Sequence, residues 1–100
     1  MLNAHHSSDS LSTFLASHPH WQSDQRTLTA VFSLPDFATA MRVVNEVARA
    51  AEELHHHPVW TNEYNKLTFV LTTKDQGEVV TERDVELAKA IEKIVATVSE

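Results

Sequence analysis

A run of three histidines, His55-His56-His57, directly precedes Pro58 and carries the strongest chemical signal in the sequence. Imidazole has a reference pKa of about 6.5, so it can donate or accept a proton near neutral pH. Glu52 lies four residues before His56. On a helix it would be close enough to orient that ring, or it could be a carboxylate on a solvated face. The segment predicts acid–base chemistry in a cleft.

Two other interpretations of the histidine run remain open. The run could be solvated and purely structural, or it could bind a metal, because imidazole is the commonest side-chain ligand for metals in proteins. Adjacent residues on a helix fan out by about 100° per step, so three consecutive histidines do not converge on one ion. No carboxylate-x-x-His pattern is repeated elsewhere in the chain. We therefore expect no metal site.

The rest of the composition removes most other kinds of chemistry. The 100 residues include one glycine, Gly77, and no cysteine. Without cysteine there is no disulfide framework, thiolate zinc site, iron–sulfur cluster or thiol nucleophile. With one glycine, neither G-x-G-x-x-G nor a Walker-type phosphate loop can be written. We expect no cofactor, and the seven histidines remain as the groups best suited to chemistry at neutral pH.

The charge pattern argues against nucleic-acid and membrane partners. Eight Lys and Arg residues against fourteen Asp and Glu residues give a formal net charge of −6, and the basic residues form no run. A nucleic-acid-binding protein normally has a basic stripe that neutralises phosphates. A membrane span needs about 20 apolar residues, and no stretch approaches this length. The polar segment 1–10 has no signal-peptide hydrophobic region, so we expect a cytoplasmic protein.

The elements that position the histidine run can be predicted from hydrophobic periodicity. Residues 1–8 are expected to be a flexible lead-in and residues 9–100 a single domain, because domains cluster near about 100–150 residues. The first helix begins at Asp9 or Ser10 and must stop before Pro19. Apolar alternation then predicts a hairpin, with strands over 21–23 and 27–32.

A long helix is expected to precede the histidine run and to position it. It starts in the segment 33–36, with Ser33 as one candidate N-cap and Asp36 as its capping-box partner. An apolar stripe with 4-3-4-3 spacing follows, which is typical of a helix that buries one face. The helix ends at the histidine run, because the residue before Pro58 is pushed out of the α region.

The C-terminal half is expected to contain a second hairpin and a last helix. Strands over 59–64 and 67–73 flank Asn65-Lys66, a plausible tight turn. Thr81 is the expected N-cap of the last helix, with Asp84 at the capping-box position. The order is therefore α-β-β-α-β-β-α. This order predicts the α+β class, with a four-stranded antiparallel sheet that has three helices packed on one face. An uncovered face or edge strand would invite self-association.

The chain also resembles the pterin-4a-carbinolamine dehydratases over residues 11–94. The family motif is an acidic residue, three positions, His-His-Pro, five positions, an aromatic residue, nine positions, a histidine, and later an aspartate. The matching residues in this chain are Glu52, His56-His57-Pro58, Tyr64 and Asp84. Lys74 stands where the family has its third histidine.

The resemblance implies a cofactor-free hydro-lyase that forms a dimer or tetramer. The family removes water from 4a-hydroxytetrahydropterin to give quinonoid dihydropterin, in the recycling of tetrahydropterin after aromatic amino acid hydroxylation. By motif position, His56 is similar to an acid–base group and His57 to a substrate-positioning or electrostatic partner, while Pro58 would fix the turn that aims both. The segment Thr73-Lys74-Asp75-Gln76 corresponds to the family's second substrate-contacting stretch.

Lys74 leaves two hypotheses open. An ammonium group has a reference pKa of about 10.4, so it can stabilise a departing hydroxide but cannot accept a proton at neutral pH. The first hypothesis is a slower dehydratase in which His56 transfers the proton and Lys74 supplies charge. The second is a scaffold that has lost catalysis and acts as a binding or assembly protein for an unidentified partner. The sequence favours the first, because the rest of the motif is intact.

Overall fold

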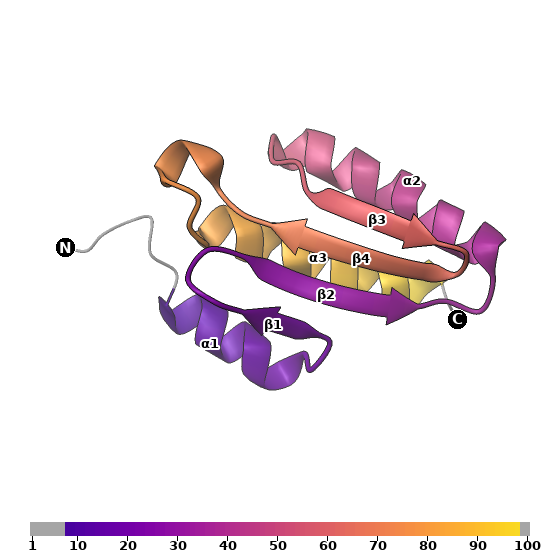
Figure 1. The fold of residues 1–100 in the computed structure, drawn as a ribbon, viewed down its shortest axis with the longest axis horizontal. Helices are drawn as coiled ribbons and strands as arrows, with labels where there is room; N and C mark the ends of the chain where they lie inside the picture. The colour runs from indigo at the N-terminus through magenta and orange to yellow at the C-terminus, as the bar shows by residue number, and fades with distance from the viewer. Residues whose placement is uncertain (1–7, 99–100) are drawn as a thin grey trace.

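The computed structural model describes residues 8–98 and has the predicted order of elements (Figure 1). Of the expected lead-in, residues 1–7 lie outside the described residues, and the first helix begins at Ser8. The elements are α1 (Ser8–Ser17), β1 (Trp21–Ser23), β2 (Leu28–Ser33), α2 (Phe37–Leu54), β3 (Val59–Glu63), β4 (Lys66–Leu71), the 3₁₀ turn η1 (Lys74–Gln76) and α3 (Glu82–Val98).

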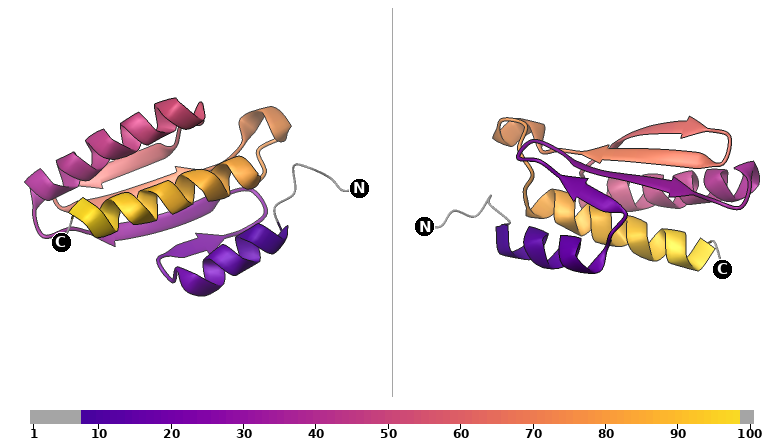
Figure 2. Two further views of the ribbon diagram at one scale, coloured as in Figure 1. Left: turned by 180° about the vertical axis from the view of Figure 1, so that it is seen from behind. Right: turned by 60° about the horizontal axis from the view of Figure 1, so that its bottom comes forward.

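The four strands form one antiparallel sheet in the order β1-β2-β4-β3. The three helices lie on the same side of it (Figure 2). The predicted α+β class and its layers are confirmed. Within residues 8–98, none of the helices is both long and apolar enough to span a bilayer.

The core lies between the central strands and the helices. The strands contribute every second residue, because side chains alternate across a sheet. The inward-facing residues of β2 and β4 are buried: Leu28, Ala30, Phe32, Leu67, Phe69 and Leu71. Opposite them, α2 and α3 bury a stripe with helical spacing: Val43, Val47, Ala51, Val85, Ala88 and Ile91. The other face of the sheet is uncovered, and Val31 and Val59 are exposed on it.

Two local predictions are corrected by the structure. The long helix begins at Phe37, and its N-cap is Asp36, whose carboxylate accepts from the Thr39 amide at 2.8 Å. Ser33 is not the cap, because it is the last residue of β2 and pairs with Lys66.

The second hairpin turn lies one residue earlier than predicted, at residues 64–65. Glu63 pairs with Lys66, which leaves Tyr64 and Asn65 as the turn. Asn65 is held by the segment before α2, since its side-chain amide donates to the Leu34 carbonyl at 2.7 Å and its own carbonyl accepts from the Leu34 amide at 2.9 Å. This docking fixes the register of β4.

Candidate active site

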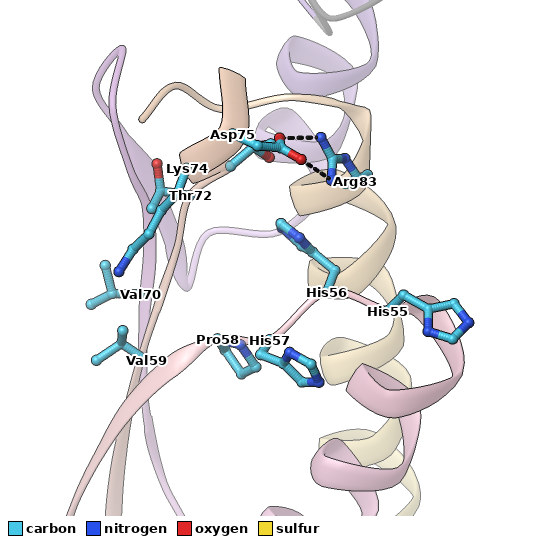
Figure 3. A pocket seen from close by; sticks show the side chains of 11 residues that line it. His55, His56, His57, Pro58, Val59, Val70, Thr72, Lys74, Asp75 and Arg83 are labelled. Atoms are coloured by element: carbon cyan, nitrogen blue, oxygen red, sulfur yellow. Dashed lines mark hydrogen bonds and ion pairs between the residues drawn. The ribbon is translucent and has the colours of Figure 1, made fainter. Parts of the chain in front are cut away.

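The histidine run lies at a sharp turn where α2 ends. His55 adopts the left-handed conformation, with φ 53° and ψ 42°, and its amide donates to carbonyls of the last helical turn. This conformation is uncommon for a residue other than glycine, but it is a frequent way to end a helix. The chain then leaves the helix toward Pro58, so the three side chains point in different directions (Figure 3).

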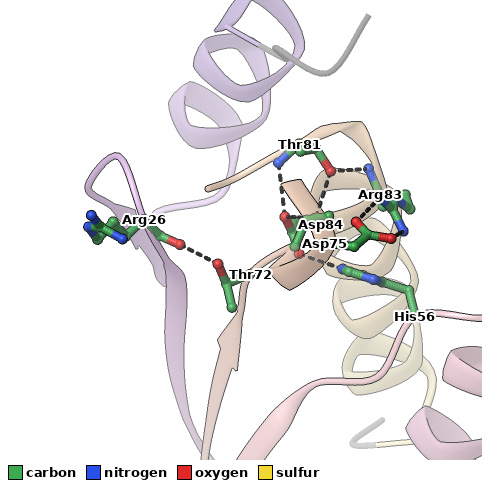
Figure 4. A network of polar contacts seen from close by, with 8 residues as sticks. Arg26, His56, Thr72, Asp75, Thr81, Arg83 and Asp84 are labelled. Atoms are coloured by element: carbon green, nitrogen blue, oxygen red, sulfur yellow. Dashed lines mark hydrogen bonds and ion pairs between the residues drawn. The ribbon is translucent and has the colours of Figure 1, made fainter. Parts of the chain in front are cut away.

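His56 turns inward and meets a buried carboxylate. It is 8% exposed, and its Nε2 lies 2.6 Å from Oδ1 of Asp84, which is fully buried. The other carboxylate oxygen, Oδ2, accepts from the Thr73 hydroxyl at 2.8 Å and from the Thr81 amide at 2.9 Å. We call these four residues, His56, Thr73, Thr81 and Asp84, the Asp84 network (Figure 4). Its members come from the end of α2, the end of β4 and the start of α3.

The Asp84 network determines the state of the His56 ring. An ionised carboxylate can only accept hydrogen bonds, so Nε2 carries a proton toward Asp84. In the neutral ring Nδ1 is then the nitrogen with the free lone pair. Among residues 8–98, Nδ1 has no hydrogen-bond partner. The ring is thus held by one nitrogen and can exchange protons through the other.

Of the two roles left open for Glu52, orientation of His56 is wrong, and the carboxylate lies on the solvated face instead. The Oε2 atom of Glu52 lies 2.7 Å from Nε2 of His57, and both side chains are largely exposed. The expectation assumed a continuous helix through residue 56, whereas α2 ends at Leu54. The left-handed turn carries His56 away from Glu52 and brings His57 back to it. An ion pair exposed to this degree contributes little to stability.

A cavity of about 490 Å³ lies beside these histidines. Its floor includes Val59 and Val70, which are cross-strand neighbours on the uncovered face of the sheet. The predicted site residues that line it are His56, His57, Pro58, Thr73, Lys74 and Asp75. Glu52 and Gln76 are not part of the lining.

Sequence reasoning left several lining residues out of the site: His55, Val59, Val70, Thr72 and Arg83. Strand alternation could have placed the two valines on one face. Asp84 was expected as a capping residue and as the aspartate of the family motif, and the structure confirms the capping hydrogen bond from the Thr81 amide. No local signal marks its contact with His56, because the two residues are 28 positions apart.

One wall of the cavity is closed by a salt bridge between the 3₁₀ turn and α3. Arg83 donates to both carboxylate oxygens of Asp75, at 2.7 and 3.4 Å. These hydrogen bonds hold the pKa of the Asp75 carboxyl below its ordinary range, and the same contact raises the pKa of Arg83. Gly77, with φ 89°, ends the turn in the left-handed region that glycine adopts readily.

Within residues 8–98, no group of three or more acidic or histidine side chains is arranged to hold a metal ion.

Comparison with known proteins agrees with this architecture. Residues 4–94 match the family described as pterin 4 alpha carbinolamine dehydratase. The chain belongs to this family. A relative from Prochlorococcus marinus that is assigned by name to these dehydratases is 38% identical over 85 residues, which cover 85% of this chain and 88% of the relative. A similarly named relative from Rhodospirillum rubrum is 41% identical over 83 residues, covering 81% and 85%.

Two solved structures share the fold. The crystal structure of a transcriptional coactivator/pterin dehydratase from Brucella melitensis superposes with a TM-score of 0.80 at 31% identity, covering 89% of this chain and 96% of that one. A pterin dehydratase-like protein described as a RuBisCO assembly factor in the alpha-carboxysome has a TM-score of 0.62 at 17% identity, covering 75% and 86%. The second likeness shows the fold alone.

Replacement of the network carboxylate should destabilise the fold. In Asp84→Ala both acceptor oxygens are removed, so the buried Thr81 amide and the His56 ring N–H lose their partner. We expect a loss of about 1–3 kcal/mol in the free energy of unfolding, measured by urea denaturation. The control Glu86→Gln removes an exposed carboxylate from the same helix and should change stability by less than about 0.5 kcal/mol. Equal stability of the two variants would contradict the network.

The salt bridge at the cavity wall predicts a pH dependence. Because the folded-state pKa of Asp75 is lowered, the stabilisation from its pairing with Arg83 is present above the ordinary carboxyl pKa and is lost as pH falls through the lowered value. A carboxyl ¹³C NMR titration should therefore find Asp75 titrating below the usual aspartate range. In Arg83→Gln the pKa of Asp75 should return toward that range. A pKa that does not move on this substitution would show that the pair is not formed in solution.

Proposed function

We propose that this protein dehydrates a 4a-hydroxytetrahydropterin to the quinonoid dihydropterin by acid–base catalysis at His56, within tetrahydropterin recycling. The observation that carries the proposal is the 2.6 Å contact between His56 and the buried Asp84, at the wall of a cavity large enough for a small ligand. Membership of the dehydratase family supports the same reaction.

The reaction needs one group that moves protons in both directions. The C4a–O bond breaks, hydroxide leaves as water after taking up a proton, and N5 gives up its own proton. No oxidant or reductant is needed. His56 in its protonated form delivers a proton from Nδ1 to the departing oxygen, and in its neutral form it can accept one. Such proton transfer typically contributes about 10²–10⁴-fold to the rate. Asp84 keeps Nε2 protonated and the ring oriented throughout.

The other predicted residues have supporting roles in this proposal. His57, held by Glu52, supplies hydrogen bonding and charge at the cavity mouth. Pro58 ends the turn that aims both histidines. Of the predicted stretch Thr73-Lys74-Asp75-Gln76, the residues that line the cavity, Thr73 to Asp75, contact the edge of the substrate, and the apolar floor lies against the face of its ring. Lys74 contributes positive charge to the cavity.

The protein as a whole is proposed to be a single domain over residues 9–100 that works in the cytoplasm as a homodimer or homotetramer, with no nucleic-acid or membrane partner. The exposed valines on the uncovered sheet face, together with β3 at the end of the strand order, favour self-association.

Lys74 favours a second candidate function, that of a catalytically weakened protein that binds or assembles a partner. The likeness to a RuBisCO assembly factor shows that a protein of this fold is described in such a role. Under this alternative the protein would not accelerate dehydration above the spontaneous rate.

Replacement of His56 tests the proposed reaction. In His56→Gln the amide can still donate to Asp84, so the network is kept while the titrating ring is lost. We expect kcat/KM for a synthetic 4a-hydroxytetrahydropterin, measured by stopped flow, to fall by about 10²-fold or more. The control His20→Gln changes an exposed histidine outside the cavity and should have wild-type activity. If both variants turn over at the wild-type rate, the catalytic role of His56 is wrong.

Restoring the family's third histidine should raise the rate. Lys74→His places a group that both donates and accepts protons at the cavity wall, where the lysine only donates. We expect kcat to increase by about tenfold or more in the same assay, as a second acid–base group is worth at least that. Lys74→Gln serves as the control, since it removes the charge without adding an acid or base. No gain in Lys74→His would reject this account of the lysine.

A further inference from the structure

The side chains that line the cavity carry one more positive than negative charge, although the chain has a formal net charge of −6, and the buried carboxylate of Asp84 lies behind His56, engaged by the Asp84 network. The lining contains Lys74 and Arg83 but only one carboxylate, Asp75. Both oxygens of Asp75 are engaged by Arg83. The nearby Glu52 is engaged by His57 and lies outside the lining. Within residues 8–98, Lys74 forms no ion pair, so its charge has no counter-ion from the described chain.

Lys74 lies across the cavity from the proposed acid–base groups. It is exposed at the start of η1, and in Figure 3 its side chain runs toward Val70 and Val59 of the floor. His56 and His57 lie on the other side of the cavity in the same view. A flat ligand resting on the two valines would therefore have imidazoles at one edge and an unpaired ammonium at another.

We propose that Lys74 is a specificity residue that binds an anionic group on the substrate, so that the preferred substrates are tetrahydropterins with a carboxylate or phosphate on the C6 side chain. The inference rests on the proposed function. The pterin ring is neutral near pH 7 and cannot balance the ammonium. The C6 side chain is the substituent that can extend beyond the ring and across the cavity while C4a and N5 stay at His56. The side chain is therefore the part of the substrate that can bring the missing negative charge to Lys74.

This proposal explains why residue 74 is a lysine where the family has a histidine. A lysine ammonium stays charged across the neutral range, whereas an imidazole does not. Its long, flexible side chain can follow a substituent of variable length. The position gives up part of the acid–base function and gains a permanent charge for recognition.

Equilibrium binding of oxidised pterins tests the proposal without requiring turnover. The probes are 6-carboxypterin, the phosphate ester of 6-hydroxymethylpterin, and neutral 6-hydroxymethylpterin, followed by pterin fluorescence or calorimetry. We expect the wild-type protein to bind at least one anionic probe about two- to fivefold more tightly than the neutral one, as befits a partly exposed ion pair. This preference should shrink as salt is added.

Matched variants assign the preference to one residue. Lys74→Gln should abolish it, and Lys74→Arg should retain it. Lys93→Gln, which removes one positive charge from α3 outside this cavity, should also retain it. A wild-type protein without a preference would overturn the proposal. So would an equal weakening of all probes in Lys74→Gln, which would place the lysine on a carbonyl of the ring.

The stopped-flow assay separates this inference from the proposed function. Dehydration of neutral and anionic substrates at equal kcat/KM would overturn the charge selectivity and leave the dehydratase intact. A Lys74-dependent preference in binding without any acceleration of dehydration would sustain the selectivity and reject the reaction. Failure of every pterin to bind would reject both.

Discussion

The hydrogen bond between His56 and Asp84 is the interaction on which the candidate site depends. A fully buried carboxylate is stable only when its oxygens are hydrogen-bonded, and here the imidazole, the Thr73 hydroxyl and the Thr81 amide satisfy them. The three donors come from the end of α2, the end of β4 and the residue before α3. One carboxylate therefore joins the segments that form the cavity, and it orients the ring of His56.

The two sides of the cavity differ in burial. This difference suits a reaction that has a proton-transfer step and a substrate with a variable side chain. On one side the His56 ring is buried and held by the Asp84 network. On the other, Lys74 is exposed. Between them, Val59 and Val70 form an apolar floor on the sheet face that no helix covers. The buried side supplies chemistry at a fixed position, and the exposed side is free to recognise what the substrate carries.

Much of the fold could be predicted because its periodicities are strong. Alternation along β2 and β4 and the apolar stripe of α2 gave the layers, and Pro58 located the end of the long helix. Local turns were harder. The sequence predicted Ser33 as the N-cap of α2 and Asp36 as its capping-box partner, whereas in the structure Ser33 pairs with Lys66 in the sheet and Asp36 is the cap. The predicted contacts of the site were wrong, because the left-handed conformation of His55 turns His56 away from Glu52. The hydrogen-bond partner of His56 is Asp84, which is 28 positions away, and hydrophobic periodicity does not predict such a contact.

The most direct test of the central claim is the tautomer of His56 in the wild-type protein, measured by long-range ¹H–¹⁵N NMR of histidine-labelled material. If Asp84 orients the ring, Nε2 of the neutral ring carries the proton, held toward Asp84, and Nδ1 shows the shift of an unprotonated nitrogen. A neutral ring protonated at Nδ1, or one that averages between both tautomers, would contradict it. Either result would mean that Asp84 does not orient the proposed acid–base group.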